Sequence, residues 1–212
     1  MAAKLERTQV VDTALRLLDE TGLEGLTLRR IATELGVKAP ALYWHFANKQ
    51  ALLDEMATEM LRRMLTAEPP APGADWREWL LLTCRTLRRT LLAHRDGAKV
   101  FSGTRLTDTG HAGRFEEQLR AFVRDGFTLD DAVEAYFTAY SFTIGFVIEE
   151  QAVHPMPGER APGYDTEERA RAVGADHPLT AASGTGLFAD YDRRFERGLA
   201  VIVAGAEAVL RS

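Results

Sequence analysis

Apolar residues recur at intervals of three and four through most of the chain, and no stretch of useful length alternates apolar with polar residues. Over residues 5–21 this spacing predicts an amphipathic helix with Gly22 as its C-terminal stop. The same spacing predicts longer helices over 49–66, 76–93 and 127–151. The sequence therefore predicts an all-α fold.

Two short helices are predicted after the first one. Thr27 can cap a helix that ends at Gly36, and Pro40 can occupy the first turn of another that ends near His45. A turn of three or four residues that contains glycine joins them, which is the helix-turn-helix pattern whose second helix enters the major groove of DNA. Asn48 can then cap the longer helix that follows.

Three large side chains, Tyr43, Trp44 and His45, are consecutive on the second short helix and cannot all point into one small core. Leu42 and Phe46, four residues apart, are the expected buried pair. One interpretation makes the other three incidental surface residues. The interpretation we favour makes Tyr43 and His45 contacts to phosphates or bases, with Trp44 bracing the backbone.

Charge and composition narrow the class of protein. The net charge of -5 argues against nucleic acid, but residues 1–50 hold seven Lys or Arg against six Asp or Glu, whereas residues 51–212 hold nineteen against twenty-five. A local basic cluster can therefore still meet phosphates. Its members are Arg29, Arg30, Lys38 and Lys49.

The chain offers little sign of a membrane protein or an enzyme. No stretch approaches the roughly 18 apolar residues of a membrane span, and the N-terminal segment is charged where a signal peptide is apolar, so we expect a cytoplasmic protein. Cys84 is the only cysteine, which excludes an internal disulfide and predicts a small buried apolar side chain. Nucleophile-elbow, phosphate-loop and zinc-protease motifs are absent, which argues against catalysis.

Residues 25–53, GLTLRRIATELGVKAPALYWHFANKQALL, closely resemble the signature of the TetR family of regulators, above all in the pairing of Leu-Tyr-Trp-His-Phe with Asn-Lys and two leucines. The resemblance implies a DNA-binding domain over 1–48, a linking helix over 49–66, and a helical ligand-binding and dimerisation domain over 67–212. It implies a repressor of transcription that a small molecule releases from its double-stranded DNA operator. A constitutive DNA-binding dimer, or an activator of the same fold, remains the alternative.

The resemblance also implies which residues meet DNA. Arg29 and the helix from Ala39 to His45 would face the duplex, and Lys49 would meet a phosphate. The predicted DNA-binding residues are Arg29, Ala39, Pro40, Ala41, Tyr43, Trp44, His45 and Lys49. Alanine can touch only apolar groups such as a thymine methyl, so specificity would rest on few direct hydrogen bonds together with DNA shape.

Residues 93–105 and 127–151 resemble the ligand-binding domain of the tetracycline repressors, which bind a magnesium-chelated drug. The resemblance places their two pocket histidines at Leu65 and Phe101. Because neither residue can ligate a hard cation, we expect an apolar or aromatic effector bound without a metal or other cofactor. The predicted ligand-binding residues are Leu65, Thr83, Leu87, Phe101, Thr104, Arg105, Gln118 and Glu149.

Four histidines lack metal-ligand spacing, and we interpret them as surface or hydrogen-bonded residues, namely His94, His111, His154 and His177. His111 is the exception that can still reach a ligand, since it is close in sequence to Thr104 and Arg105. Arg105 is the expected switch residue, because its loop should move against the helix over 49–66.

The resemblance implies a two-fold dimer that buries helices over about 128–153 and 187–210 in a four-helix bundle. The first of these helices has almost no polar face, so it carries more apolar surface than one domain core can bury. The alternative is that both are central helices of a monomer. A dimer would space two recognition helices about one DNA turn, or a small multiple of it, apart. Residues 155–186, rich in Pro, Gly and Ala, are expected to form a long loop with at most one short helix, which either covers a ligand entrance or is disordered.

Overall fold

The computed structural model describes residues 5–210, and over that range the chain forms helices and no strand, which confirms the predicted all-α class. Residues 1–4 and 211–212, which fall inside the predicted domain limits, lie outside the described residues. The helices are α1 (Arg7–Gly25), α2 (Leu28–Glu34), α3 (Ala39–Tyr43), α4 (Lys49–Leu65), α5 (Trp76–Leu92), α6 (Gly97–Phe101), α7 (Ala112–Arg124), α8 (Leu129–Val153), α9 (Thr166–Val173), α10 (Pro178–Phe188) and α11 (Tyr191–Val209).

Local signals set the boundaries of the N-terminal helices. The regular part of α1 ends at Gly22, whose φ of 69° is outside the helical region, and Gly36 with φ 65° follows α2. The Thr27 side chain accepts the N–H of the third residue after it, and Asn48 caps α4 in the same way. These ends are the predicted ones.

Helix α3 is shorter than the predicted span from Ala39 to His45. Its regular part ends at Tyr43, because the N–H groups of His45 and Phe46 both turn back to the carbonyl of Leu42. This tight end places Leu42 and Phe46 in the core of the N-terminal domain.

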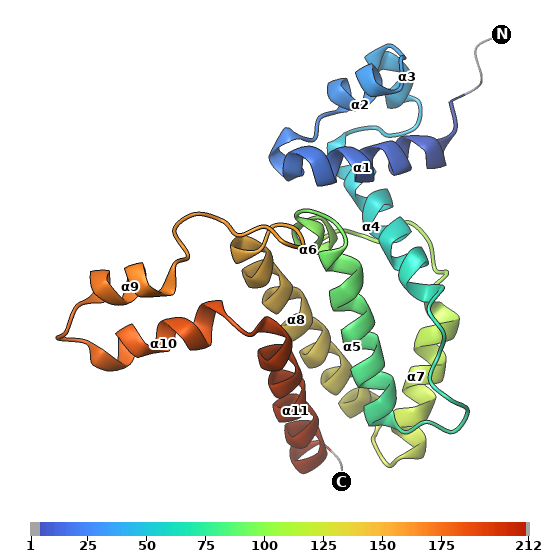
Figure 1. Cartoon of the computed structure of the whole chain (residues 1–212). Coiled ribbons are helices and arrows are strands. Elements are labelled where there is room, and N and C mark those ends of the chain that lie inside the picture. Colours follow the sequence, from blue (N-terminus) through green and yellow to red (C-terminus); the bar gives the residue numbers. More distant parts are fainter. Residues whose placement is uncertain (1–4, 211–212) are drawn as a thin grey trace.

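A continuous apolar core runs from the N-terminal helices into the larger domain. Met56 and Met60 on α4 are fully buried in it, together with Leu91 of α5 and Val147 of α8. A second core around Trp76 joins α5, α7, α8 and α11. Figure 1 shows the result: α1 to α3 sit on one end of the helical body, and α4 descends from them along its side.

The expectation of a long loop over residues 155–186 is wrong. This segment contains α9, capped by Asp165, and α10, which begins at Pro178 and packs on α9. Tyr164 and Phe188 close the base of the pair, with ring centroids 5.5 Å apart. The two helices form a hairpin that projects from the body (Figure 1).

The last predicted helix, over 187–210, is divided. Phe188 ends α10, and α11 begins only at Tyr191, because Asp190 adopts a left-handed backbone conformation with φ 52°. From there α11 packs along α8. Within the described residues, no helix is long and apolar enough to cross a membrane.

Candidate DNA-contacting helix and effector cavity

The aromatic side chains of α3 divide between core and surface. Leu42 and Phe46 are buried, whereas Tyr43 is 56% exposed and Trp44 is 90% exposed. An indole that exposed is unusual for its size, and it has no role in the domain core. Arg29 on α2 is also exposed. These side chains are available to a partner.

The remaining predicted DNA contacts are more mixed. Pro40 is exposed, while Ala39 and Ala41 are half-buried. The carbonyl of His45 accepts Nη1 of Arg7 at 3.0 Å. The ammonium of Lys49 donates to the carbonyl of Leu23 at 3.0 Å, so it fastens α4 to the segment between α1 and α2. A phosphate at this position would share that ammonium with the carbonyl.

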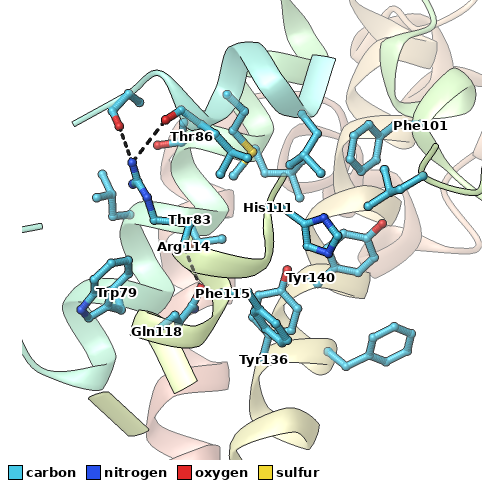
Figure 2. Close-up of a pocket in the computed structure, with 18 of the residues that line it drawn as sticks. Trp79, Thr83, Thr86, Phe101, His111, Arg114, Phe115, Gln118, Tyr136 and Tyr140 are labelled. Carbon is cyan, nitrogen blue, oxygen red and sulfur yellow. Dashed lines mark hydrogen bonds between the residues drawn. The ribbon is translucent and has the colours of Figure 1, made fainter. Parts of the chain in front are cut away.

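A cavity of about 310 Å³ lies between α4, α5, α7 and α8, and α6 with the loop after it forms one edge (Figure 2). Its lining is mainly apolar and aromatic, as ligand pockets usually are. Six of the predicted ligand-binding residues line it, namely Leu65, Thr83, Leu87, Phe101, Thr104 and Gln118.

Two predicted ligand-binding residues do not line this cavity. The side chain of Arg105 is exposed, and its backbone N–H donates to Asp54 on α4 at 3.2 Å. Glu149 is exposed on α8. The α9–α10 hairpin contributes no residue to the cavity lining either, so within this protomer it does not cover the entrance.

Sequence reasoning missed the aromatic wall that α7 and α8 contribute. Phe115 lies 4.8 Å from Tyr136 between ring centroids, and Tyr136 lies 6.1 Å from Tyr140 in a stacked arrangement. Phenols are protonated at neutral pH, and burial raises the pKa of both further above it. The spacing of Tyr136 and Tyr140, four residues apart on α8, is the available signal, but a helix with almost no polar face also fits a dimer surface, and the sequence does not separate the two sides.

Two polar atoms in the cavity wall have no partner in the described residues. Thr83 donates to Oε1 of Gln118 at 3.1 Å, which leaves the buried Nε2 of that amide without an acceptor. Nδ1 of His111 is the second such atom, and this histidine lines the cavity. Buried polar atoms without partners are rare and call for an explanation.

The donor set does not suit magnesium. Among the residues that line the cavity, Glu68 and His111 are the only carboxylate and imidazole, and Glu68 is exposed. Leu65 and Phe101 are apolar, and the described residues contain no cluster of three or more His, Cys, Asp or Glu that could hold a metal ion. A hard cation needs several oxygen ligands, which this wall does not supply.

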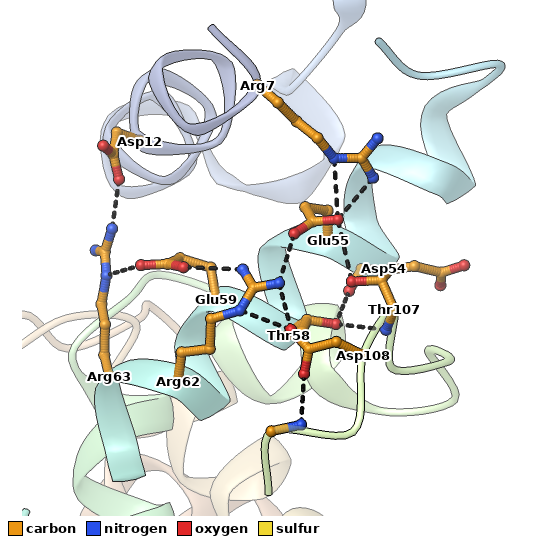
Figure 3. A network of polar contacts seen from close by, with 11 residues as sticks. Arg7, Asp12, Asp54, Glu55, Thr58, Glu59, Arg62, Arg63, Thr107 and Asp108 are labelled. Carbon is orange, nitrogen blue, oxygen red and sulfur yellow. Dashed lines mark hydrogen bonds and ion pairs between the residues drawn. The ribbon is translucent and has the colours of Figure 1, made fainter. Parts of the chain in front are cut away.

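A polar network links the loop beside the cavity to the N-terminal helices (Figure 3). Glu55 on α4 is its buried centre: it accepts Arg7 of α1 at 2.6 Å, Arg62 at 2.9 Å and the hydroxyl of Thr107 at 3.0 Å. Burial alone would raise the pKa of Glu55, but these hydrogen bonds outweigh it and hold the pKa below its ordinary value. Arg62 also forms ion pairs with Asp108 at 2.6 Å and with Glu59 at 3.1 Å.

Two family models match the chain. Residues 10–56 match the model described as bacterial regulatory proteins, tetR family, and residues 69–210 match the tetracyclin repressor-like C-terminal domain. The chain is 44% identical over 202 residues to the Escherichia coli tetracycline repressor protein class A from transposon 1721, which covers 95% of this chain and 90% of that protein. It is 41% identical over 206 residues to the class C repressor of Escherichia coli, covering 96% and 91%.

Solved structures agree with this similarity. A possible TetR family transcriptional regulator from Streptomyces coelicolor A3(2) superposes with a TM-score of 0.82 at 38% identity, covering 96% of this chain and all of the other. TetR(class A) in complex with 5a,6-anhydrotetracycline and magnesium superposes with a TM-score of 0.70 at 37% identity, covering 96% and 99%.

Proposed function

This chain belongs to the TetR family of bacterial regulatory proteins, and we propose that its effector is a largely apolar or aromatic molecule that binds without magnesium in the cavity between α4 and α8. The protein is a DNA-binding transcriptional repressor that responds to a small molecule, acts as a dimer and is not an enzyme. A cytoplasmic location is part of the proposal.

The apolar lining of the cavity carries the proposal. Leu65 and Phe101 stand in the wall where the resemblance to the tetracycline repressors places histidines. The class A repressor structure contains a tetracycline derivative and magnesium, whereas a cation in this cavity would meet His111 and an exposed Glu68 and no further carboxylate or imidazole of the lining. An uncharged aromatic ligand suits such a wall better, because it gains contact area without needing to desolvate an ion.

The proposed DNA contact is made by α3 and the residues beside it. The exposure of Trp44, Tyr43 and Arg29 supports this role. We assign phosphate or base contacts to Tyr43, His45 and Arg29, apolar contacts to the alanines and proline at the start of α3, and a shared phosphate contact to Lys49.

The proposed route of release starts at the loop between α6 and α7. Thr104 and Leu106 of this loop line the cavity, while the N–H of Arg105 and the hydroxyl of Thr107 bond to α4. Successive residues of this loop therefore face alternately the cavity and α4. An effector that displaces this loop shifts the equilibrium only if it binds the displaced conformation more tightly than the DNA-binding one.

The proposed dimer surface is the outer face of α8 and α11. Large apolar side chains remain exposed on both helices, namely Val133 on α8 and Val201 and Val209 on α11. A monomer in water would leave these side chains uncovered.

The test is to select operator fragments with the purified protein from genomic DNA and then to ask which compounds release them, with and without magnesium. We expect release by aromatic compounds that is unchanged when a chelator removes magnesium. Tetracycline that releases DNA only when magnesium is present would contradict the proposal. If no compound raises the melting temperature, the constitutive dimer is favoured, since a ligand at 100 times its Kd stabilises by about 2.7 kcal/mol.

A further inference from the structure

We propose that Glu149 on α8 of each protomer binds Arg193 on α11 of the other, and that these two ion pairs select a second copy of this chain as the dimer partner. The inference rests on the proposed function, because it takes the outer face of α8 and α11 to be the dimer surface. It adds the charges that determine which partner this surface accepts. It also gives a role to Glu149, which lies outside the cavity lining.

Contacts inside the protomer place Glu149 and Arg193 at the same height along the two helices. Nη2 of Arg88 on α5 contacts the carboxylate of Glu150 on α8 at 2.6 Å and that of Asp192 on α11 at 2.7 Å. Glu150 and Asp192 are therefore level with each other. Glu149 and Arg193 are their immediate neighbours in the chain, one on each helix.

The two helices run antiparallel, so this register continues along both of them. Phe142, two turns before Glu150 on α8, stacks on Phe195, one turn after the start of α11, with ring centroids 5.7 Å apart. The same ring occupies the space in which Gly198 has no side chain. Moving backward along α8 thus corresponds to moving forward along α11.

The outer faces of the two helices carry charges without partners at this height and small residues beyond it. Glu149, Arg193 and Arg197 are exposed, and none of them forms an ion pair within the described part of the chain. Over the next two turns the exposed residues are small or apolar, namely Ser141 and Gly145 on α8 and Ala200, Val201, Ala204 and Gly205 on α11. Small side chains let two helices approach closely, and this brings the charges at the end of the faces within reach of a partner.

Arg193 also lines a hollow of about 440 Å³ at the start of α11. The lining contains three guanidinium groups and one carboxylate, and its residues are Gly186, Ala189, Asp190, Arg193, Arg194 and Arg197. Nη1 of Arg194 already donates to the carbonyl of Leu187 at 2.6 Å. Arg193 and Arg197 are the two that can receive a carboxylate from outside, to which a guanidinium binds through two parallel hydrogen bonds.

Two-fold symmetry brings the opposite charges together. Both N-terminal domains must reach one DNA duplex, so the two-fold axis runs from the helical body toward α1 to α3, and α8 and α11 extend side by side away from that end (Figure 1). Rotation about this axis leaves each residue at its own height. In a bundle of two helix pairs the copies of each helix are diagonal, so the neighbour of α8 across the axis is the partner's α11. Glu149 therefore meets Arg193 of the partner subunit, with Arg197 one turn away.

The experiment mixes two charge reversals in the full-length protein at low salt. Glu149→Arg and Arg193→Glu each place like charges opposite one another in their own homodimer, twice per dimer, because an isologous interface repeats every contact. We expect sedimentation to show that each reversal raises the dimer Kd at least tenfold.

In the mixed dimer both contacts again join opposite charges. Native mass spectrometry of an equimolar mixture should therefore show about nine-tenths heterodimer, the share that a tenfold tighter Kd produces, whereas random association produces about half. The excess of heterodimer should fall in about 1 M salt, because partly exposed charges are screened.

Two further variants show whether the effect is specific. The chain that carries both reversals should form a dimer at least fivefold tighter than either single variant, which a merely misfolded single variant would not predict. Glu117→Arg makes the same reversal at an exposed residue of α7, outside this face, and should leave the dimer Kd unchanged.

Random mixing of the two reversals, a double variant no tighter than the single ones, or an equal loss in Glu117→Arg would overturn the inference. The wild-type protein separates this failure from a failure of the proposed function. If wild type is a dimer that an effector releases from its operator while the reversals mix at random, the ion pairs are wrong and the proposed function stands. If wild type is a monomer, the proposed dimer itself fails.

Discussion

The hydroxyl of Thr107 lies 3.0 Å from Oε2 of Glu55, the same carboxylate oxygen that accepts Arg7 of α1. One buried side chain on the linking helix thus holds both the loop beside the cavity and the first helix of the DNA-binding domain. Leu106, the residue before Thr107, lines the cavity. A ligand that moves this loop would disturb the hydrogen bond from Thr107 to Glu55. Because Glu55 also binds Arg7, the position of α1 would change with it.

Thr107→Val should weaken the coupling between ligand and DNA. The substitution keeps the shape of the side chain but removes the hydrogen bond to Glu55, at a cost of about 1 kcal/mol. We expect the Kd for effector to stay within twofold of wild type, while the effector concentration for half-maximal operator release changes at least threefold. Fluorescence anisotropy of labelled operator measures this. Thr109→Val makes the same change at an exposed position of the same loop, and equal behaviour of the two variants would refute the coupling.

Glu55→Gln should lower stability in a pH-dependent manner. Burial raises the pKa of Glu55, but the hydrogen bonds from Arg7, Arg62 and Thr107 outweigh it, so the folded pKa lies below the unfolded one. The charge therefore stabilises the fold above the unfolded pKa of about 4.3, and this contribution is lost as the pH falls through the folded pKa.

Urea unfolding at fixed protomer concentration tests that sign. We expect the variant to lose about 1–2 kcal/mol at pH 7, since charge-assisted hydrogen bonds to partly exposed arginines are screened. The difference from wild type should shrink near pH 3. A difference that grows on acidification would show that the folded pKa of Glu55 is raised instead.

The sequence predicted the DNA-binding domain well because its signals are local. Thr27, Gly36 and Asn48 act on their own helix ends, and the spacing of Leu42 and Phe46 alone determines which side of α3 is buried. The resemblance predicts six of the residues that line the cavity. The other lining residues come together only through tertiary packing. Phe115 and Tyr136 come together only because α7 packs on α8.

Tertiary packing also explains why the expected loop over residues 155–186 is wrong. The composition of this segment predicts a loop, but Asp165 caps α9 and Pro178 begins α10, and the two helices stabilise each other by packing together. The resemblance predicts Arg105 as a ligand contact, and that stays a prediction. In the fold its exposed side chain lies outside the cavity lining and its backbone N–H bonds to Asp54 of α4, which no local pattern indicates.

Trp44→Ala should weaken operator binding without affecting the fold. The indole is 90% exposed, so its removal should change the free energy of unfolding by no more than about 0.5 kcal/mol. We expect at least a tenfold loss of operator affinity by gel shift. Leu42→Ala, on the buried side of the same helix, should instead cost about 2–5 kcal/mol in stability. Normal operator affinity of Trp44→Ala would remove α3 from the interface.

Val201→Glu should dissociate the dimer and, for that reason, weaken DNA binding. Val201 is 72% exposed on α11, so the folded protomer tolerates a carboxylate there, whereas a dimer interface would have to bury it unpaired. We expect sedimentation to show at least a hundredfold increase in the dimer Kd, about 2.7 kcal/mol. Operator affinity should fall with it, because the second recognition helix then binds as a separate molecule.

Val123→Glu provides the control, since this valine is also exposed but lies on α7, on the other side of the body (Figure 1). Dissociation by Val123→Glu, or a dimer unaffected by Val201→Glu, would place the interface elsewhere.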